Sequence, residues 1–321
     1  MKKILSLSFA LVLSLALIMC LVACESKSDD GLIFKYNIGE GSYEVRGAAG
    51  ALSEISIPSE YKGRPVTSIA DRAFAESAEL TKVTVPSSVV RIGAHAFTAC
   101  DSLTEAVICD GVGEIGNYAF SGCDSLTRIT IPDSVTKIGA WAFSRCDALE
   151  EVVIGDGVTE IGNDAFSMCS KLSVLTIGKN VEKIYDYAFY GCEQLTEVDI
   201  PDSVSLIGAS AFGGCSALAS IELGSGVEAL GAYAFSGCVS LTEIVIPESV
   251  RIISHYAFSN CASLASIYLP KSLESVGNYA FCDCESLSDV RYAGSAEDWA
   301  KIDISNMGNE SMTDAKIVFG K

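Results

Sequence analysis

Apolar residues recur along this chain in columns that repeat every 23 residues. The dipeptide Ala-Phe marks the repeat and recurs at this constant spacing, starting at Ala73, Ala96, Ala119, Ala142, Ala165, Ala188, Ala211, Ala234, Ala257 and Ala280. A fixed period of about 20–30 residues is typical of a solenoid, in which each repeat forms one coil of a stack. The pattern predicts an elongated core that neighbouring coils share.

Each repeat contains an alternating segment that predicts a short strand. Leu126, for example, is followed by Ile129 and Ile131, with polar residues between them. Alternation with period two gives a strand one buried face. Pro132 then ends the segment, because proline cannot donate to a strand ladder. A second apolar pair, a tight turn that prefers glycine, Ala-Phe and a short helical turn complete the repeat.

A single coil of this kind cannot bury its own apolar residues. We therefore expect about ten coils to stack, with their strands in parallel and their backbone groups bonded to neighbouring coils. Identical residues then lie above one another, so the phenylalanines are expected to form a continuous aromatic column. At about 4.8 Å per strand, such a stack spans on the order of 50 Å.

The unit from Cys123 to Cys146 shows the whole repeat, from cysteine through leucine, the strand, proline and glycine to Ala-Phe. It resembles the repeat of the BspA-like (treponemal-type) leucine-rich repeat family of bacterial cell-surface proteins. The resemblance covers residues 66–292. It implies an α/β leucine-rich repeat solenoid of about ten 23-residue coils, with parallel strands and short helical turns and a cap at each end.

The N-terminus has the pattern of a bacterial export signal. Lys2 and Lys3 precede an apolar run that stops at Cys24. A basic start, a short apolar stretch and small residues before a cut are typical of a signal peptide. The cut site resembles a lipobox, which predicts residues 1–23 as a lipoprotein signal peptide and Cys24 as the lipidated first residue. Ordinary cleavage and a single membrane anchor are the alternatives.

The repeats are flanked by segments that differ from them. Residues 24–31 are polar and small, which predicts a flexible tether. Residues 32–65 resemble the family's N-terminal cap and first coil, with a capping hairpin from Phe34 to Arg46. Caps are expected because an end coil otherwise exposes its core and an unpaired strand edge.

Residues 293–321 resemble the family's C-terminal cap. Ser295 and Asp298 have the spacing of a capping box, which predicts the start of a short helix. Ile317 and Phe319 recur with the period of two that is typical of a strand, which predicts a final strand.

The chain is strongly acidic, with a formal net charge of −19. Residues 1–23 carry two lysines and no acidic residue, so the charge of the remainder is −21. This charge argues against nucleic acid as a partner, and against membrane contact other than through the lipid anchor.

No enzyme motif interrupts the repeats. A nucleophile elbow, a Gly-rich phosphate loop and an HExxH motif are absent from the sequence, and its Cys and His residues lack metal-ligand spacing. We therefore expect no catalytic residues, no metal and no cofactor.

Nine cysteines form a column of their own, the cysteine ladder: Cys100, Cys123, Cys146, Cys169, Cys192, Cys215, Cys238, Cys261 and Cys284. Free cysteine is among the most buried residue types, and stacked parallel side chains point the same way, so we expect a reduced, buried ladder. Disulfides between neighbouring rungs are the alternative for an exported protein. Cys109 and Cys282 lie outside the column and are expected to be the most accessible thiols.

The outward side of the strands is the first candidate binding surface. Leucine-rich repeats present this face on their concave side, where solenoid curvature makes it an extended surface. Its candidate residues are Glu197, Asp199, Glu222, Glu243 and Tyr268. The four carboxylates fall on three consecutive strands and repel one another, which indicates a basic partner or a bound cation. Chance clustering of acids on a solvated sheet is the alternative.

A second candidate is the aromatic stripe, formed by the residue before Ala-Phe. Its members are Tyr118, Trp141, Tyr187, Tyr233, Tyr256 and Tyr279, with His95 in the same column. Rings in register offer flat apolar area with a polar tip, which suits a carbohydrate or a peptide. The alternative is that the rings pack along one another over the turn.

The resemblance implies a non-enzymatic lipoprotein that is exported and anchored on the extracellular face of the bacterial cell membrane. It further implies adhesion, with a protein or glycan ligand at the cell surface, since family members are associated with extracellular-matrix binding. Two other functions stay open. A structural cell-envelope spacer has no ligand, and a glycan-binding module uses an exposed Tyr/Trp stripe.

Overall fold

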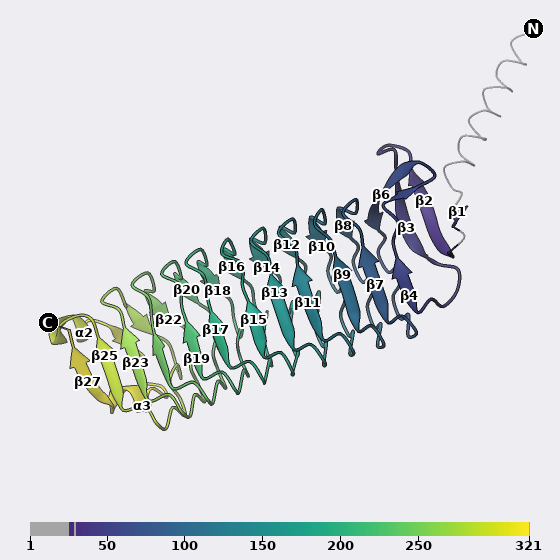
Figure 1. Cartoon of the computed structure of the whole chain (residues 1–321). Coiled ribbons are helices and arrows are strands. Elements are labelled where there is room, and N and C mark those ends of the chain that lie inside the picture. Colours follow the sequence, from purple (N-terminus) through teal and green to yellow (C-terminus); the bar gives the residue numbers. More distant parts are fainter. Residues whose placement is uncertain (1–25, 29, 321) are drawn as a thin grey trace, which may run out of the picture.

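The computed structural model describes residues 26–28 and 30–320. They form one elongated stack of coils, with the N-terminal cap at one end and two short helices, α2 (Ala296–Trp299) and α3 (Glu310–Thr313), at the other (Figure 1). The leucine-rich repeat solenoid with parallel strands is thereby confirmed. The predicted signal peptide and the predicted lipidation site Cys24 lie outside the described residues.

The strand face consists of the strands that follow each leucine. These strands form four separate sheets, and within each sheet neighbouring strands pair in parallel in the register of the repeat. Arg128 thus faces Glu151, and Glu151 faces Val174. Apolar residues point inward as predicted, because Ile129 and Ile131 are buried. The strands are β4 (Glu54–Ser56), β7 (Lys82–Val85), β9 (Glu105–Ile108), β11 (Arg128–Ile131), β13 (Glu151–Ile154), β15 (Val174–Thr176), β17 (Glu197–Asp199), β19 (Ser220–Glu222), β21 (Glu243–Val245), β23 (Ser266–Leu269), β25 (Asp289–Tyr292) and β27 (Lys316–Phe319).

A second strand of each coil belongs to one long sheet that runs the length of the stack. These strands are mostly two residues long and contain the second apolar pair of the repeat, with Ile115 facing Ile138. They are β6 (Arg64–Ile69), β8 (Arg91–Ile92), β10 (Glu114–Ile115), β12 (Lys137–Ile138), β14 (Glu160–Ile161), β16 (Lys183–Ile184), β18 (Leu206–Ile207), β20 (Ala229–Leu230), β22 (Ile252–Ile253), β24 (Ser275–Val276) and β26 (Asp303–Ile304).

The N-terminal cap continues the long sheet. The predicted hairpin is present, since β2 and β3 pair antiparallel, and β3 then pairs in parallel with β6. β1 pairs with β2, so the sheet begins inside residues 24–31, the segment expected to be a tether. The strands of this cap are β1 (Ser26–Lys27), β2 (Leu32–Asn37), β3 (Ser42–Ala48) and β5 (Glu60–Tyr61).

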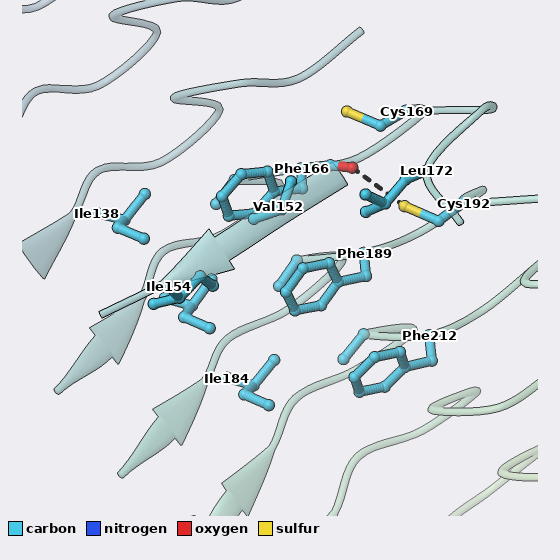
Figure 2. Close-up of a cluster of buried hydrophobic side chains, with 14 of the residues drawn as sticks. Ile138, Val152, Ile154, Phe166, Cys169, Leu172, Ile184, Phe189, Cys192 and Phe212 are labelled. Carbon is cyan, nitrogen blue, oxygen red and sulfur yellow. Dashed lines mark hydrogen bonds between the residues drawn. The ribbon is translucent and has the colours of Figure 1, made fainter. Parts of the chain in front are cut away.

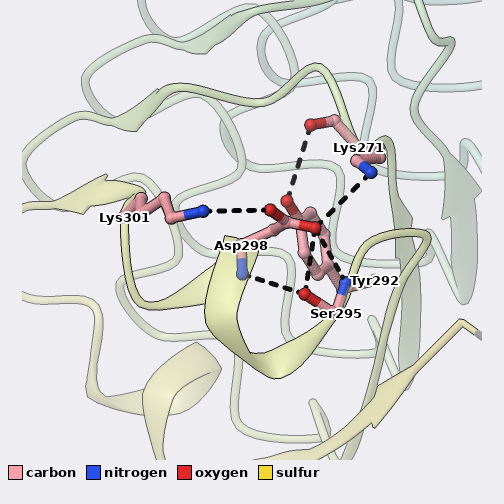
Figure 3. A network of polar contacts seen from close by, with 5 residues as sticks. All are labelled: Lys271, Tyr292, Ser295, Asp298 and Lys301. Atoms are coloured by element: carbon pink, nitrogen blue, oxygen red, sulfur yellow. Dashed lines mark hydrogen bonds and ion pairs between the residues drawn. The ribbon is translucent and has the colours of Figure 1, made fainter.

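The predicted capping box opens α2 in the C-terminal cap. The Ser295 hydroxyl accepts from the Asp298 N–H at 3.1 Å, and the Asp298 carboxylate accepts from the Ser295 N–H at 3.3 Å. Lys271 and Lys301 lie 3.5 and 3.3 Å from the same carboxylate (Figure 3). The Ser295 hydroxyl and N–H, followed by Lys301, lower the pKa of Asp298 to about 2. The final strand, β27, pairs with β25 and covers the last coil.

The core consists of stacked columns. Rings of the ten Ala-Phe phenylalanines lie 4.9–5.8 Å apart and within 13° of parallel. Figure 2 shows Phe166, Phe189 and Phe212 in this column. The Cys192 thiol donates to the Phe166 carbonyl at 3.4 Å, and all nine ladder thiols repeat this bond at 3.1–3.4 Å. A cysteine here gives a buried carbonyl a donor.

The third side of each coil is a run of hydrogen-bonded turns, and the described α-helices lie in the C-terminal cap. Two residues in most coils are left-handed: one precedes Ala-Phe, such as Tyr118 (φ 57°), and one precedes the cysteine, such as Arg145 (φ 58°). The repeat's glycine column is not left-handed. A Cβ on Gly93 would lie 2.5 Å from the Ala70 carbonyl carbon, so close approach of the neighbouring coil requires glycine there.

Candidate functional site

The acidic cluster of the strand face lies on adjacent strands, as expected. Asp199 on β17 faces Glu222 on β19, so their backbones are about one strand spacing apart, near 4.8 Å. Glu197 lies on β17 and Glu243 on β21, separated by one strand. All four side chains are exposed, because their positions alternate with buried Val198, Ile221 and Ile244.

The charge of this acidic cluster is not balanced locally. Among the described residues, none of its four carboxylates forms an ion pair. Other strands of the same face do pair their charges: Lys82 lies 2.9 Å from Glu105, and Arg291 lies 2.7 Å from Asp289. The middle of the strand face is therefore a negative region between two ends where acids and bases are paired.

Tyr268 adjoins the acidic cluster on β23. It faces Val245 in the register of β21 and β23, and the side chains are 38% and 62% exposed. An exposed apolar pair thus follows Asp199 and Glu222 along one row of the strand face, in the next of its sheets. A peptide that crosses this row meets carboxylates first and an aromatic ring second.

The aromatic stripe is divided into two stacks. His95, Tyr118 and Trp141 stack at centroid distances of 4.6 and 5.0 Å, and Tyr233, Tyr256 and Tyr279 stack at 4.5 and 4.9 Å. Every member is left-handed, with φ from 55° to 60°. The rings therefore pack on one another, as the alternative for the stripe has it, while their edges stay partly exposed, as for Tyr233 at 42%. Binding of a carbohydrate or a peptide to the stripe stays a prediction.

Tyr187 stands between the stacks, because Asp164 and Ser210 interrupt the stripe on either side of it. Next to Asp164 is a cleft of about 460 Å³, the Asp164 cleft, which Trp141, Tyr187, Arg145, Met168 and Tyr190 also line. This cleft was not predicted from the sequence, because only the aromatic residues of the stripe were considered there. The sequence carries only a partial signal, since two polar residues, Asp164 and Ser210, break the aromatic pattern and the cleft lies beside Asp164.

The cysteines are free thiols throughout the described chain. Those of the ladder are buried, and burial raises the pKa of Cys215 and of Cys284 to about 12. Cys109 and Cys282 are partly exposed. Burial and the neighbouring Asp283 carboxylate, 3.3 Å from the thiol, raise the pKa of Cys282.

A larger cleft of about 670 Å³ lies on the long sheet, away from the predicted residues. Ile252 and Ala229 line it beside Arg251, which pairs with Glu274. Across residues 26–28 and 30–320, no group of three His, Cys, Asp or Glu side chains is arranged to hold a metal ion. In the same residues, no helix has the length and hydrophobicity that a membrane crossing requires.

A comparison with protein-family models agrees with the repeat architecture. The family model of the BspA type leucine-rich repeat region matches residues 67–196 and 182–302, in six copies. A solved leucine rich cell surface protein from Faecalibacterium prausnitzii A2-165 is 28% identical, with 88% of this chain and 98% of that chain covered and a TM-score of 0.41. A leucine-rich repeat protein from Bacteroides ovatus ATCC 8483 is 27% identical, with 92% and 100% covered and a TM-score of 0.42. No curated protein matches the sequence.

Proposed function

Because the chain belongs to the BspA-type leucine-rich repeat family, we propose that it is a non-enzymatic cell-surface protein that binds a basic protein segment through its strand face. Its export and attachment through a lipid on Cys24 are part of the same proposal. They rest on the N-terminal sequence pattern, with its basic start, apolar run and cysteine.

The observation that carries this proposal is the unpaired acidic cluster on β17, β19 and β21. Like charges on adjacent strands destabilise a sheet, so the fold itself gains nothing from placing Asp199 opposite Glu222. A partner with lysine or arginine side chains removes the repulsion on binding and is steered to the surface by the field. The exposed ring of Tyr268 offers flat contact area beside the carboxylates.

The test replaces Glu197, Asp199, Glu222 and Glu243 by their amides in the full chain. Binding to a panel of purified extracellular-matrix proteins is measured by surface plasmon resonance. At about 0.3–0.5 kcal/mol for each exposed charge pair, we expect affinity for the basic partner to fall at least about tenfold. Thermal stability should rise slightly, because the like charges no longer repel.

The matched control neutralises one aspartate and three glutamates that lie off the strand face, namely Asp147, Glu193, Glu228 and Glu285. It changes the net charge equally, so a loss specific to the strand-face variant separates a local site from the general field. If the strand-face variant binds every matrix protein as well as the parent does, the surface is a solvated sheet and the spacer function gains support.

A further inference from the structure

The Asp164 cleft lies where one ring of the aromatic stripe is missing, between Trp141 and Tyr187. Trp141 ends a stack whose rings are 4.6 and 5.0 Å apart, and Tyr187 is the next ring along the column. Two coil spacings therefore separate Trp141 from Tyr187, about 10 Å between ring centres. A ring inserted midway would lie about 5 Å from each, which is the separation of stacked rings.

The second interruption of the stripe, at Ser210, leaves no comparable opening. The Tyr190 ring leans over the coil of Ser210, since a Cβ on Gly213 would be 3.1 Å from it. Ser210 is only 6% exposed. A polar residue in the column is therefore not sufficient for a cleft, and the opening at Asp164 is a separate feature of this coil.

The cleft combines flat apolar walls with charged groups of both signs. Asp164 is half-buried at the missing-ring position, and burial is the largest cause of its raised pKa. Arg145 is exposed and lines the same cleft. Neither residue forms an ion pair with any described residue. The Asp164 carboxylate accepts from the Ser167 hydroxyl and has further lone pairs for a ligand, and the Arg145 guanidinium has five N–H donors.

We propose that the Asp164 cleft binds one neutral pyranose ring of a surface glycan. The C–H faces of the sugar lie against Trp141 and Tyr187, and its hydroxyls donate to the Asp164 carboxylate and accept from the Arg145 guanidinium. This site is on the turn side of the coils. The proposed sugar binding does not depend on the strand face, so the test of one surface can fail while the test of the other succeeds.

The pair of opposite charges selects a neutral sugar over the other flat ligands. An arginine or lysine side chain meets the like charge of Arg145, and an acidic sugar meets that of Asp164. An apolar aromatic ring leaves both charged groups desolvated and without a partner, which costs binding energy. A neutral ring with hydroxyls on its rim satisfies both groups.

The test observes the indole N–H signals by NMR in the ¹⁵N-labelled full chain. The chain has two tryptophans, and Trp299 packs on Tyr292 in the C-terminal cap with ring centroids 5.3 Å apart, so its signal is an internal control. The probes are the methyl glycosides of glucose, galactose, mannose and N-acetylglucosamine, with arginine methyl ester as the cationic probe. We expect at least one glycoside to shift the Trp141 signal with a Kd of about 1–10 mM, as for other ligands of this size.

Two variants and one control test whether the sugar binds in the cleft. Asp164→Tyr completes the stripe with the residue that holds a left-handed φ of 58° at Tyr187, so it should fold and abolish the shift. Asp164→Asn keeps the cleft open and should weaken binding about tenfold, because a charge-assisted bond is lost. Arg72→Tyr adds a ring to the same column at another left-handed position (φ 60°) and should leave the Kd unchanged.

Three results overturn the proposal. The Trp141 signal does not respond to any glycoside, or it responds to arginine methyl ester alone, which identifies a cationic peptide as the occupant. The third is an Asp164→Tyr variant that folds, by its circular dichroism and dispersed spectrum, and still shows the parental shift.

Discussion

Single residues of this protein are selected by their contact with the neighbouring coil as well as by their own coil. The ladder cysteines show this, because each thiol reaches the carbonyl of a phenylalanine 26 residues earlier, as Cys215 does to Phe189 at 3.3 Å. The Phe189 carbonyl also accepts from the Cys192 N–H at 3.3 Å, so the thiol is its second donor. A hydrophobic residue of similar size fills the same space but removes that second bond. The same bond keeps the thiols inside the stack and away from solvent.

The reactivity of the thiols follows from this burial. In a segment from Ser26 to Lys321, which lacks Cys20 and Cys24, we expect a thiol reagent such as DTNB to label Cys109 and Cys282 in the native state. The nine ladder cysteines should react only on unfolding, because they are buried and the reagent cannot reach them in the native state. Labelling with and without denaturant, followed by peptide mass spectrometry, measures the difference. Fast native labelling of mid-stack Cys192 would contradict the buried ladder.

Stability should fall in alkali for the same reason. The pKa of Cys215 is raised from 9.0 to about 12. Below pH 9 the thiol is protonated in both states; above it, the unfolded chain ionises while the folded chain does not. Each such thiol then removes about 1.4 kcal/mol of unfolding free energy per pH unit up to its folded pKa. Urea unfolding between about pH 8 and 10 measures this slope of unfolding free energy against pH. Cys215→Ala should make the slope shallower by the contribution of one thiol. An identical slope in parent and variant would disprove the assignment.

At the scale of elements, each coil is stabilised by its two neighbours, because its strands are too short to be stable alone. The strands of the long sheet are mostly two residues long, yet they pair in register from β6 to β26. Stability of such a stack is approximately a sum of coil terms and nearest-neighbour interface terms. The caps complete the end interfaces with a hairpin at one end and with α2, α3 and β27 at the other.

Truncations of phenylalanine should reveal these interface terms. Phe166 is fully buried and lies 5.1 and 5.4 Å from the rings of Phe143 and Phe189. Phe166→Ala should cost about 3–5 kcal/mol, as for other core phenylalanines. Phe319→Ala should cost less, because that ring is 37% exposed and belongs to the last strand. Chemical denaturation of both variants measures the costs, and equal losses would be inconsistent with a nearest-neighbour stack.

At the scale of the whole molecule, the two candidate binding surfaces lie on different sides of the stack. The strand face carries the acidic cluster, and the turn side carries the aromatic stripe with the Asp164 cleft. In the proposed function, the solenoid presents both faces to partners at once. Two weak contacts on one rigid body reinforce each other, since the second becomes intramolecular.

The anchor is tested by replacing the proposed lipidated residue. Cys24→Ala should release the protein from membranes or leave it unprocessed, because the thioether to the lipid cannot form. Membrane fractionation with mass determination of the N-terminus measures this. The anchor is ruled out if the Cys24→Ala variant loses its signal segment and still partitions into membranes as the parent does.

The amino-acid sequence by itself determined the solenoid, its register and its core. Each coil has almost the same environment as its neighbours, so a 23-residue period places Ile129 against Val152 and each phenylalanine against the next one. The acidic cluster was predictable for the same reason, since the register brings Asp199 opposite Glu222. Local rules also sufficed for the capping box of Ser295 and Asp298.

Only the tertiary structure decided the backbone conformation of the turn side and the shape of its surface. Dihedral preferences of single residues favour glycine at left-handed positions, yet Tyr118 and Trp141 occupy them, because backbone bonds between coils and ring stacking outweigh the local strain. The Asp164 cleft depends on where the neighbouring side chains lie. Tyr190 covers the gap at Ser210 and leaves the one at Asp164 open, a result of packing between coils that no single repeat encodes.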